Sequence, residues 1–232
     1  MRKLLFLSAI AAAIAIALTW WVWRPGLAPL AADASLDFDA RNIAKGAELT
    51  TLGNCSDCHT LAGGASYAGG RPVETPFGTV YASILTPDRE TGIGAWSEEA
   101  FRRAMREGVD REGRDLYPAF PYDHFTVVTD EDVKAIYAFL MSRTAVSNSV
   151  PQTELDFPYN IRFLVAGWKL LFLHQNSLAP DPSQSEEWNR GRYLVEGLGH
   201  CGSCHTPRNV LGAEERGSLY AGGAAGGWHA WL

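Results

Sequence analysis

The sequence predicts an all-α protein in which two small domains follow each other behind an N-terminal apolar helix, with the second domain incomplete. Three observations predict this class: strand-like alternation is sparse, capped stretches of helical periodicity recur, and one pattern of Gly, Cys and His positions occurs twice. The expected divisions are an apolar helix over 1–25, a linker over 26–39, a first domain over 40–146, a connector over 147–184 and a partial second domain over 185–232.

The N-terminal segment is an apolar run from Leu4 to Trp23 without a charged residue, about the length of one bilayer-spanning helix. Arg2-Lys3 precedes it, and Trp20-Trp21-Val22-Trp23 closes it with aromatic residues typical of a membrane interface. The positive residues predict that everything after the run lies on the periplasmic side of a bacterial inner membrane. An uncleaved anchor is favoured over a signal peptide cut near Ala31-Ala32-Asp33-Ala34, and both place the chain in the same compartment.

Three helices are expected in the first domain. Residues 41–52 place apolar side chains at helical spacing and lead into the first cysteine pair. Ser97 is a favourable N-cap with two glutamates after it, which predicts a helix over 97–107 that a glycine ends. Thr129, with an aspartate three residues later, resembles a capping box and predicts a helix over 129–141.

The connector contains a segment, residues 161–174, that is apolar on nearly all sides when read as a helix. This segment is too short to span a bilayer and carries Arg162 and Lys169, so a buried or docking helix is expected. A further helix over 185–198 then leads into the second cysteine pair.

An internal repeat supports two domains. Eight residues separate Lys45-Gly46 from Cys55, and nine separate Arg190-Gly191 from Cys201. Tyr67-Ala-Gly-Gly also recurs as Tyr220-Ala-Gly-Gly. The first copy continues for about seventy residues after this mark, whereas the second reaches Leu232 nine residues after it. The expectation is therefore a fragment of a longer protein, or a domain that a partner completes.

Both copies contain Cys-x-x-Cys-His, and the chain's four cysteines all belong to these two pairs. Thiols one helical turn apart can form thioethers with the two vinyl groups of a haem, while the next histidine turns its imidazole to the iron. Two such matches behind an export segment predict two c-type haems. The expected thioether residues are Cys55, Cys58, Cys201 and Cys204, and the expected proximal iron ligands are His59 and His205.

Two other uses of the cysteines fit the sequence less well. A zinc site built from both pairs leaves the adjacent histidines unexplained and requires distant pairs to meet. A dithiol redox site is disfavoured because no βαβ pattern surrounds either pair.

The sixth iron ligand is less evident. No methionine follows Met141, so the second haem cannot take a methionine ligand from the residues of this chain. For the first haem, His124 in a Pro-rich aromatic loop is the leading candidate and Met105 the next, although core packing is the ordinary role of both Met105 and Met141.

Several runs resemble the multihaem cytochrome c subunits of membrane-bound dehydrogenases. The resemblance extends from about Asp39 to Leu232. Its runs are Ala68-Gly-Gly, Thr75-Pro-Phe-Gly-Thr, Leu85-Thr-Pro-Asp, Thr91-Gly-Ile-Gly-Ala-Trp-Ser, Leu116-Tyr-Pro-Ala, Ala166-Gly-Trp-Lys-Leu-Leu-Phe, Glu187-Trp-Asn-Arg-Gly and Gly199-His-Cys-Gly-Ser-Cys-His-Thr-Pro-Arg-Asn.

The resemblance implies tandem cytochrome c-like domains and a third c-type haem beyond Leu232. It also implies a catalytic dehydrogenase partner of the quinoprotein or molybdenum type. Many members have, where Phe120 stands, a methionine that ligates iron. Phe120 cannot do so, and this departure is the reason for naming His124.

The leading functional hypothesis is a periplasmic electron-transfer subunit, not itself an enzyme, that passes electrons from a partner dehydrogenase to membrane quinone or a terminal oxidase. The alternatives are a dihaem peroxidase-like enzyme, which needs an open iron position, and a structural anchor that only tethers a partner. A nucleic-acid partner is excluded by the net charge of −6 and the lack of a basic run.

Overall fold

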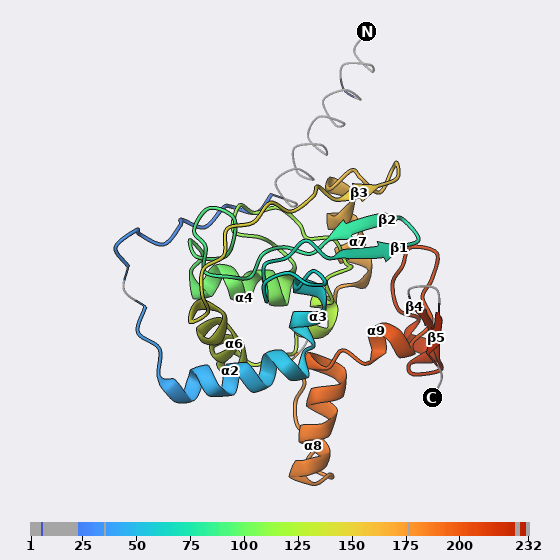
Figure 1. Ribbon diagram of the computed structural model, residues 1–232. Helices are drawn as coiled ribbons and strands as arrows, with labels where there is room; N and C mark the ends of the chain where they lie inside the picture. The colour runs from blue at the N-terminus through green and yellow to red at the C-terminus, as the bar shows by residue number, and fades with distance from the viewer. Residues whose placement is uncertain (1–5, 7–22, 35, 176, 226–227, 231–232) are drawn as a thin grey trace.

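The computed structural model describes residues 6, 23–34, 36–175, 177–225 and 228–230. Apart from Phe6 and Trp23, the predicted N-terminal membrane segment lies outside these residues. Within the described part of the chain, no helix has the length and apolar character needed to cross a bilayer. The regular elements of the described chain are mostly helices, joined by long loops and accompanied by a few short strands (Figure 1).

The helices predicted between residues 41 and 198 are all present with slightly different ends. The described helices are α2 (Ala40–Leu52), α3 (Cys55–His59), α4 (Glu98–Glu107), α5 (Tyr122–Phe125), α6 (Asp130–Met141), α7 (Phe163–Phe172), α8 (Glu186–Tyr193), the π-helical turn η1 (Leu194–Leu198), α9 (Gly202–His205) and the 3₁₀ turn η2 (Arg216–Ser218). The predicted N-caps Ser97 and Thr129 are confirmed, because each side chain accepts a hydrogen bond from a backbone N–H of the first turn.

We call residues 40–146 the first unit and residues 185–232 the second unit. The core of the first unit forms where α2 crosses α6 and α4 packs beside them (Figure 1). The crossing is close at Gly46, where an added Cβ would lie 2.0 Å from the carbonyl oxygen of Ala135. Leu49 from α2 and Ile136 and Leu140 from α6 are almost fully buried there. Burial of these aliphatic side chains drives the association of the helices.

The expectation of a purely helical protein was wrong in one respect, since short antiparallel strands are present. β1 (Pro72–Thr75) and β2 (Gly78–Tyr81) form a hairpin, and β3 (Glu154–Leu155) pairs with β2. β4 (Gly223–Ala225) and β5 (Trp228–Ala230) form a second pair. These strands have two to four residues, too few for the alternation that identifies a strand in a sequence.

The expected linker over 26–39 is held against the first unit at its beginning. Arg103 donates to the carbonyl of Pro25 at 2.7 Å, and the N–H of Leu27 donates to the carbonyl of Arg111 at 2.8 Å. Leu30 donates to Ala95 in the same way at 2.9 Å. The chain that follows the apolar run is thus attached to the first unit by hydrogen bonds to backbone carbonyls.

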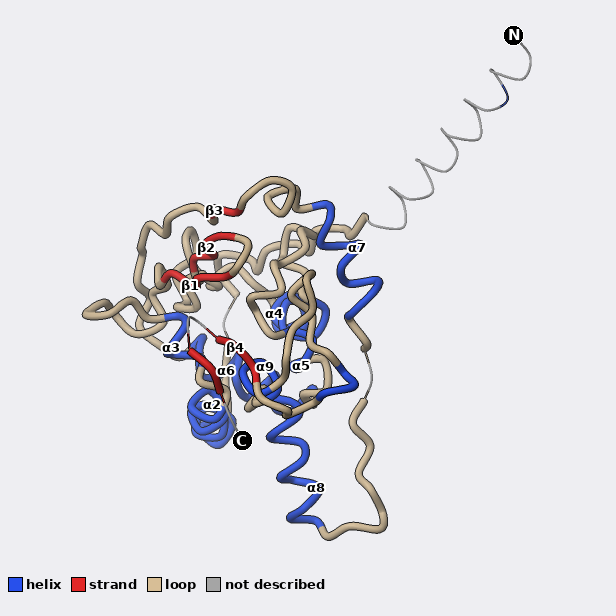
Figure 2. The backbone as a smooth tube through the Cα atoms, turned by 90° about the vertical axis from the view of Figure 1, so that its right-hand side faces the viewer, coloured by secondary structure: helices blue, strands red, loops and turns tan. Residues whose placement is uncertain are grey.

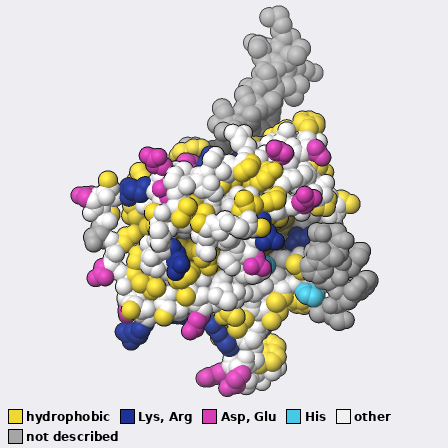
Figure 3. Space-filling view, viewed as in Figure 1, with side chains coloured by type: hydrophobic (Ala, Val, Ile, Leu, Met, Phe, Trp, Pro, Cys, Tyr) yellow, Lys and Arg dark blue, Asp and Glu magenta, His cyan; other side chains and the backbone are white. Residues whose placement is uncertain are grey.

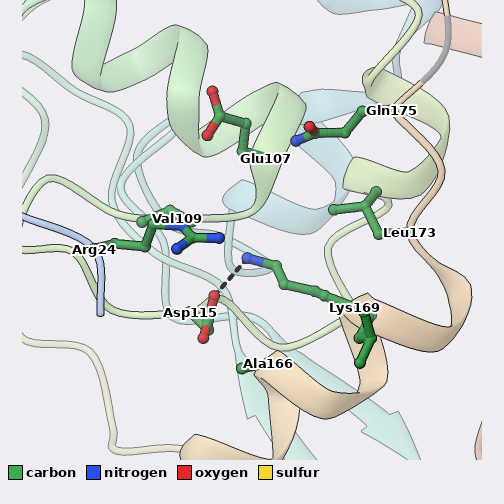
Figure 4. Close-up of a pocket in the computed structure, with 9 residues that line it drawn as sticks. Arg24, Glu107, Val109, Asp115, Ala166, Lys169, Leu173 and Gln175 are labelled. Atoms are coloured by element: carbon green, nitrogen blue, oxygen red, sulfur yellow. Dashed lines mark hydrogen bonds and ion pairs between the residues drawn. The ribbon is translucent and has the colours of Figure 1, made fainter. Parts of the chain in front are cut away.

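Helix α7 is only half buried, although its sequence predicted a buried or docking helix. Val165 and Ala166 are buried, whereas the larger apolar side chains that are exposed are Phe163, Leu164, Leu170 and Leu171. Lys169 holds the inner side by donating to Asp115 at 2.6 Å and to the carbonyl of Gly108 at 2.8 Å. Figure 4 shows this ion pair. Both residues line a pocket of about 310 Å³.

The second unit packs against the first through the end of its leading helix. Leu198 has no exposed surface and belongs to the same buried cluster as the helices of the first unit. Asp132 of α6 is an ion-pair partner of both Lys45 (2.6 Å) and Arg190 (3.8 Å), which occupy equivalent places in the internal repeat. Helix α8 itself projects away from this junction in both views (Figures 1 and 2).

Charged side chains are dispersed over the surface. In the space-filling view, Lys and Arg are scattered among acidic and hydrophobic side chains (Figure 3). This distribution agrees with the low charge density expected from the composition and offers no continuous basic track for phosphates on the face in view.

Candidate functional site

The first cysteine pair lies on a single short helical turn. Helix α2 ends at Leu52, Asn54 adopts a left-handed backbone with φ of 52°, and α3 then carries both cysteines and His59. Cys55 packs against the buried cluster, while Cys58 is exposed. The two thiols are therefore presented on one turn with the histidine directly after them.

The imidazole of His59 is oriented by the backbone of the same unit. Its Nδ1 lies 2.7 Å from the carbonyl oxygen of Ser83. Because a carbonyl only accepts hydrogen bonds, Nδ1 carries the proton and Nε2 keeps its lone pair. Burial lowers the pKa of His59, against the smaller effect of this hydrogen bond, and favours the neutral ring that can ligate a metal.

The second cysteine pair repeats the backbone geometry of the first. The N–H of Gly69 donates to the carbonyl of His59 at 2.8 Å, and Gly222 donates to that of His205 at 2.9 Å. Tyr67, with φ of 61°, donates through its N–H to the hydroxyl of Thr60 at 3.1 Å. Tyr220 and Thr206 reproduce that contact, with φ of 60° and a distance of 3.1 Å. The predicted internal repeat is therefore a structural repeat.

The two histidines differ in their surroundings. Nδ1 of His205 is buried and has no hydrogen-bond partner among the residues that the structure describes. The equivalent atom of His59 has the Ser83 carbonyl. A hydrogen bond from its own unit therefore orients the His59 ring. Nδ1 of His205 has no such bond to the described residues.

The state of the thiols fits thioether attachment better than the alternatives. All four cysteines are free thiols. Burial, with a smaller effect of the Cys58 charge, raises the pKa of Cys55 to about 12, opposite to the lowered pKa of a redox-active thiol. Among the described residues the thiols do not gather closely enough to hold a metal ion together, which disfavours the zinc alternative.

A c-type haem fits the residues of both units. Cys55 and Cys58, or Cys201 and Cys204, would form the thioethers, and His59 or His205 would ligate the iron. Burial raises the pKa of the Cys58 thiol, and the charges of Asp57 and Cys204 add to this effect against the lowering effect of Arg71.

His124 has surroundings unlike those expected for a ligand of the first iron. Its Nδ1 lies 2.8 Å from the carbonyl oxygen of Glu196, and its Nε2 lies 2.7 Å from Oε1 of Glu214. Both partners belong to the second unit, so both ring nitrogens are engaged at the junction. In this arrangement the ring has no nitrogen to offer the first iron.

The remaining predicted residues lie in the core of the first unit. Met105 is 4% exposed within the buried cluster, and Met141 and Phe120 pack against that cluster. The contacts that sequence reasoning missed involve Ser83 and Glu214. Neither stands in a motif, and only the folded chain brings them to a histidine.

The chain is similar to known cytochromes c. Residues 43–144 match the family described as Cytochrome c. The chain is 49% identical over 220 residues to one of the subunits of nicotinate dehydrogenase from Pseudomonas putida, covering 94% of this chain and 18% of that protein. It is 42% identical over 175 residues to the gluconate 2-dehydrogenase cytochrome c subunit of Pantoea cypripedii, covering 75% and 40%.

A third relative is matched over more of its length. The chain is 36% identical over 213 residues to a diheme cytochrome c-type protein of Cereibacter sphaeroides, covering 88% of this chain and 69% of that protein. The chain spans less than half the length of the nicotinate and gluconate dehydrogenase subunits.

Proposed function

Because the chain belongs to the cytochrome c family, we propose that it is the electron-transfer subunit of a dehydrogenase complex and carries two covalently attached haems c. The observation that carries this proposal is the turn with two free thiols followed by His59, whose Nδ1 is bonded to Ser83. The same backbone hydrogen bonds recur around His205. The relatives named as cytochrome subunits of dehydrogenases support a non-catalytic role.

When bound, haem supplies reversible one-electron chemistry at its iron. The protein's contribution is attachment and orientation. Cys55 and Cys58 would hold the ring covalently, and the Ser83 carbonyl keeps the proton on Nδ1 of His59, so that Nε2 would be the nitrogen that ligates the iron. The buried cluster of the first unit excludes water from one side of the site.

The partner is proposed to be a catalytic dehydrogenase subunit that oxidises an N-heterocyclic carboxylate such as nicotinate. Support comes from the 49% identity to a nicotinate dehydrogenase subunit, compared with 42% for the gluconate and 40% for the fructose dehydrogenase cytochrome subunits. The electron acceptor is proposed to be membrane quinone or a terminal oxidase. A peroxidase role has no support from these relatives.

The complex is proposed to lie on the periplasmic side of the bacterial inner membrane. The sequence supports this location through Arg2-Lys3, the uncharged run that follows and the tryptophans at its end. The apolar run would hold the first unit near the membrane, because residues after it are hydrogen-bonded to that unit.

The test uses the full chain produced in cells that perform cytochrome c maturation. Two haem additions are expected by mass spectrometry, and a haem-stained band should survive boiling in detergent. Replacing Cys55 and Cys58 together by serine should remove one haem, and replacing Cys201 and Cys204 should remove the other. Absence of covalent haem from the unchanged chain would contradict the proposal.

The partner is tested separately. In membranes that contain the chain and its catalytic partner subunit, nicotinate should reduce the haems faster than gluconate or an alcohol does. Reduction by gluconate or an alcohol alone would keep the electron-transfer role and overturn the proposed substrate class.

A further inference from the structure

His124 and Glu214 form a buried pair between the two units. His124 lies in α5 of the first unit, and Glu214 follows α9 in the second, ninety residues later in the chain. Their side chains are each 11% exposed, and Nε2 of the imidazole lies 2.7 Å from Oε1 of the carboxylate. At this burial an ion pair is screened much less by solvent than one on the surface.

The hydrogen bonds define the charge state of this pair. Nδ1 of His124 donates to a backbone carbonyl, that of Glu196, so it must carry a proton. Nε2 faces a carboxylate, which also accepts. Burial acts to lower the pKa of His124, but the bond to Glu214 and the charges of Asp123 and Glu214 outweigh it, so the pKa is raised. Burial likewise acts to raise the pKa of Glu214, and its bond to His124 lowers it overall.

The pair touches the helix that attaches the second haem. A Cβ added to Gly202 would lie 2.9 Å from Cε1 of His124 and 3.2 Å from Oε2 of Glu214. Gly202 follows Cys201 and is the first residue of α9. The pair therefore lies against the backbone of the second Cys-x-x-Cys-His turn. A glycine is the residue that permits this approach.

Neighbouring contacts hold the same junction. The ring of Phe125 meets the ring of His200 edge-on at 5.5 Å, and Leu198 is fully buried beside them. Arg208 lies 3.7 Å from Glu214. The other titratable or charged groups around the pair are Asp123, His200, Arg216 and Tyr220, together with Glu196 and its partner Arg192.

We propose that the His124–Glu214 pair is a positioning element that holds the attachment helix of the second haem on the first unit and sets the reduction potential of that haem. The inference rests on the proposed haem-carrying function. Its physical basis is that an unbalanced charge against α9 would favour one oxidation state of the iron, whereas the paired charges offset one another. His205, whose Nδ1 lacks a described partner, lies on this same helix.

A metal ion is a different use of the same atoms. Asp123, His124 and Glu214 each place one ligand atom within 4.8 Å of the others. Nε2 of His124 is already bonded to Glu214, and Arg208 also approaches that carboxylate, so the contacts favour the electrostatic pair. If the pair is electrostatic, a chelator leaves the potential of the second haem unchanged.

The experiment is a redox titration of the matured full chain at pH 6, in which two one-electron steps are followed optically. His124→Gln removes the positive charge and leaves the carboxylate, so one step should move to lower potential. At a fixed ambient potential the reduced-to-oxidised ratio of that haem should fall about three- to tenfold. The double variant His124→Gln with Glu214→Gln has no net charge and should return that ratio toward the unchanged protein.

Glu215→Gln is the matched control, because it removes the same charge from the neighbouring, exposed residue. It should leave both steps in place. Glu214→Gln removes the negative charge instead and should move the same step to higher potential, so it tests the inference even if His124→Gln does not accumulate.

Several results would overturn the inference. These are an unmoved potential in His124→Gln, a double variant displaced as far as the single one, an equal shift in Glu215→Gln, or a chelator-dependent potential. A chain with two attached haems and unmoved potentials would overturn only this inference. A chain with no covalent haem would instead contradict the proposed function.

Discussion

The two Cys-x-x-Cys-His units share a backbone and differ in what supports it. The first unit has its own core, formed by α2, α4 and α6, and a carbonyl of its own that orients His59. The described part of the second unit has α8, η1 and α9, and it takes its packing partners from the first unit through Leu198 and Glu214. The Cys-x-x-Cys-His turn of the first unit is therefore stabilised by its own unit, whereas that of the second unit is stabilised by contacts with the first.

The largest expected effect tests this difference at equivalent glycines. Gly46→Ala should destabilise the protein by about 3 kcal/mol or more, because the new Cβ would meet the Ala135 carbonyl where α2 crosses α6. Gly191→Ala, at the matching place in the repeat, meets nothing within 4 Å and should stabilise α8 by up to about 1 kcal/mol. Denaturant unfolding of both variants measures their free energies of unfolding. Equal changes in the two variants would contradict the difference between the units.

The next effect concerns the residue that joins the units. Leu198→Ala should cost about 2–4 kcal/mol, since it leaves a cavity in a core made mostly by the first unit. Hydrogen exchange should then speed up in α9 more than in α6. Val195→Ala, an exposed position of η1, is the control and should change little. Uniform acceleration in both units would indicate a single shared core.

A smaller effect is expected within the second attachment turn. Gly202→Ala should cost about 1–3 kcal/mol, because its Cβ would displace the His124–Glu214 pair. Ser203→Ala is the neighbouring comparison, and it should be close to neutral because the buried Ser203 hydroxyl has no partner among the described residues. Thermal unfolding of the two haem-loaded variants measures this difference. A greater loss of stability in Ser203→Ala than in Gly202→Ala would contradict the prediction.

The smallest effect is the pH dependence of the junction, about 1 kcal/mol. The raised pKa of His124 gives stability that is complete below the ordinary histidine value of 6.5 and is lost as pH rises through the folded pKa. The lowered pKa of Glu214 gives stability that is present above 4.5 and is lost as pH falls through its folded pKa. The stability difference between the unchanged protein and the double glutamine variant should therefore be greatest between pH 4.5 and 6.5, and a flat difference would contradict the ion pair.

The helices and the attachment motifs could be predicted because their causes are local. Ser97 and Thr129 cap the turns that directly follow them, and the cysteine pairs bring their thiols together within one helical turn. The repeat was visible because equivalent residues keep nearly equal spacing. The strands were missed because each has too few residues to show a period.

Sequence by itself therefore determined the two Cys-x-x-Cys-His turns, the main helices and their capped beginnings, since each depends on residues a few positions apart. Only the tertiary structure decided that Gly46 is crowded and Gly191 open, that one side of α7 is exposed, and that His124 meets Glu214. The physical reason is that burial, close approach and charge pairing depend on which surfaces meet, and residues ninety positions apart carry no local sign of that encounter.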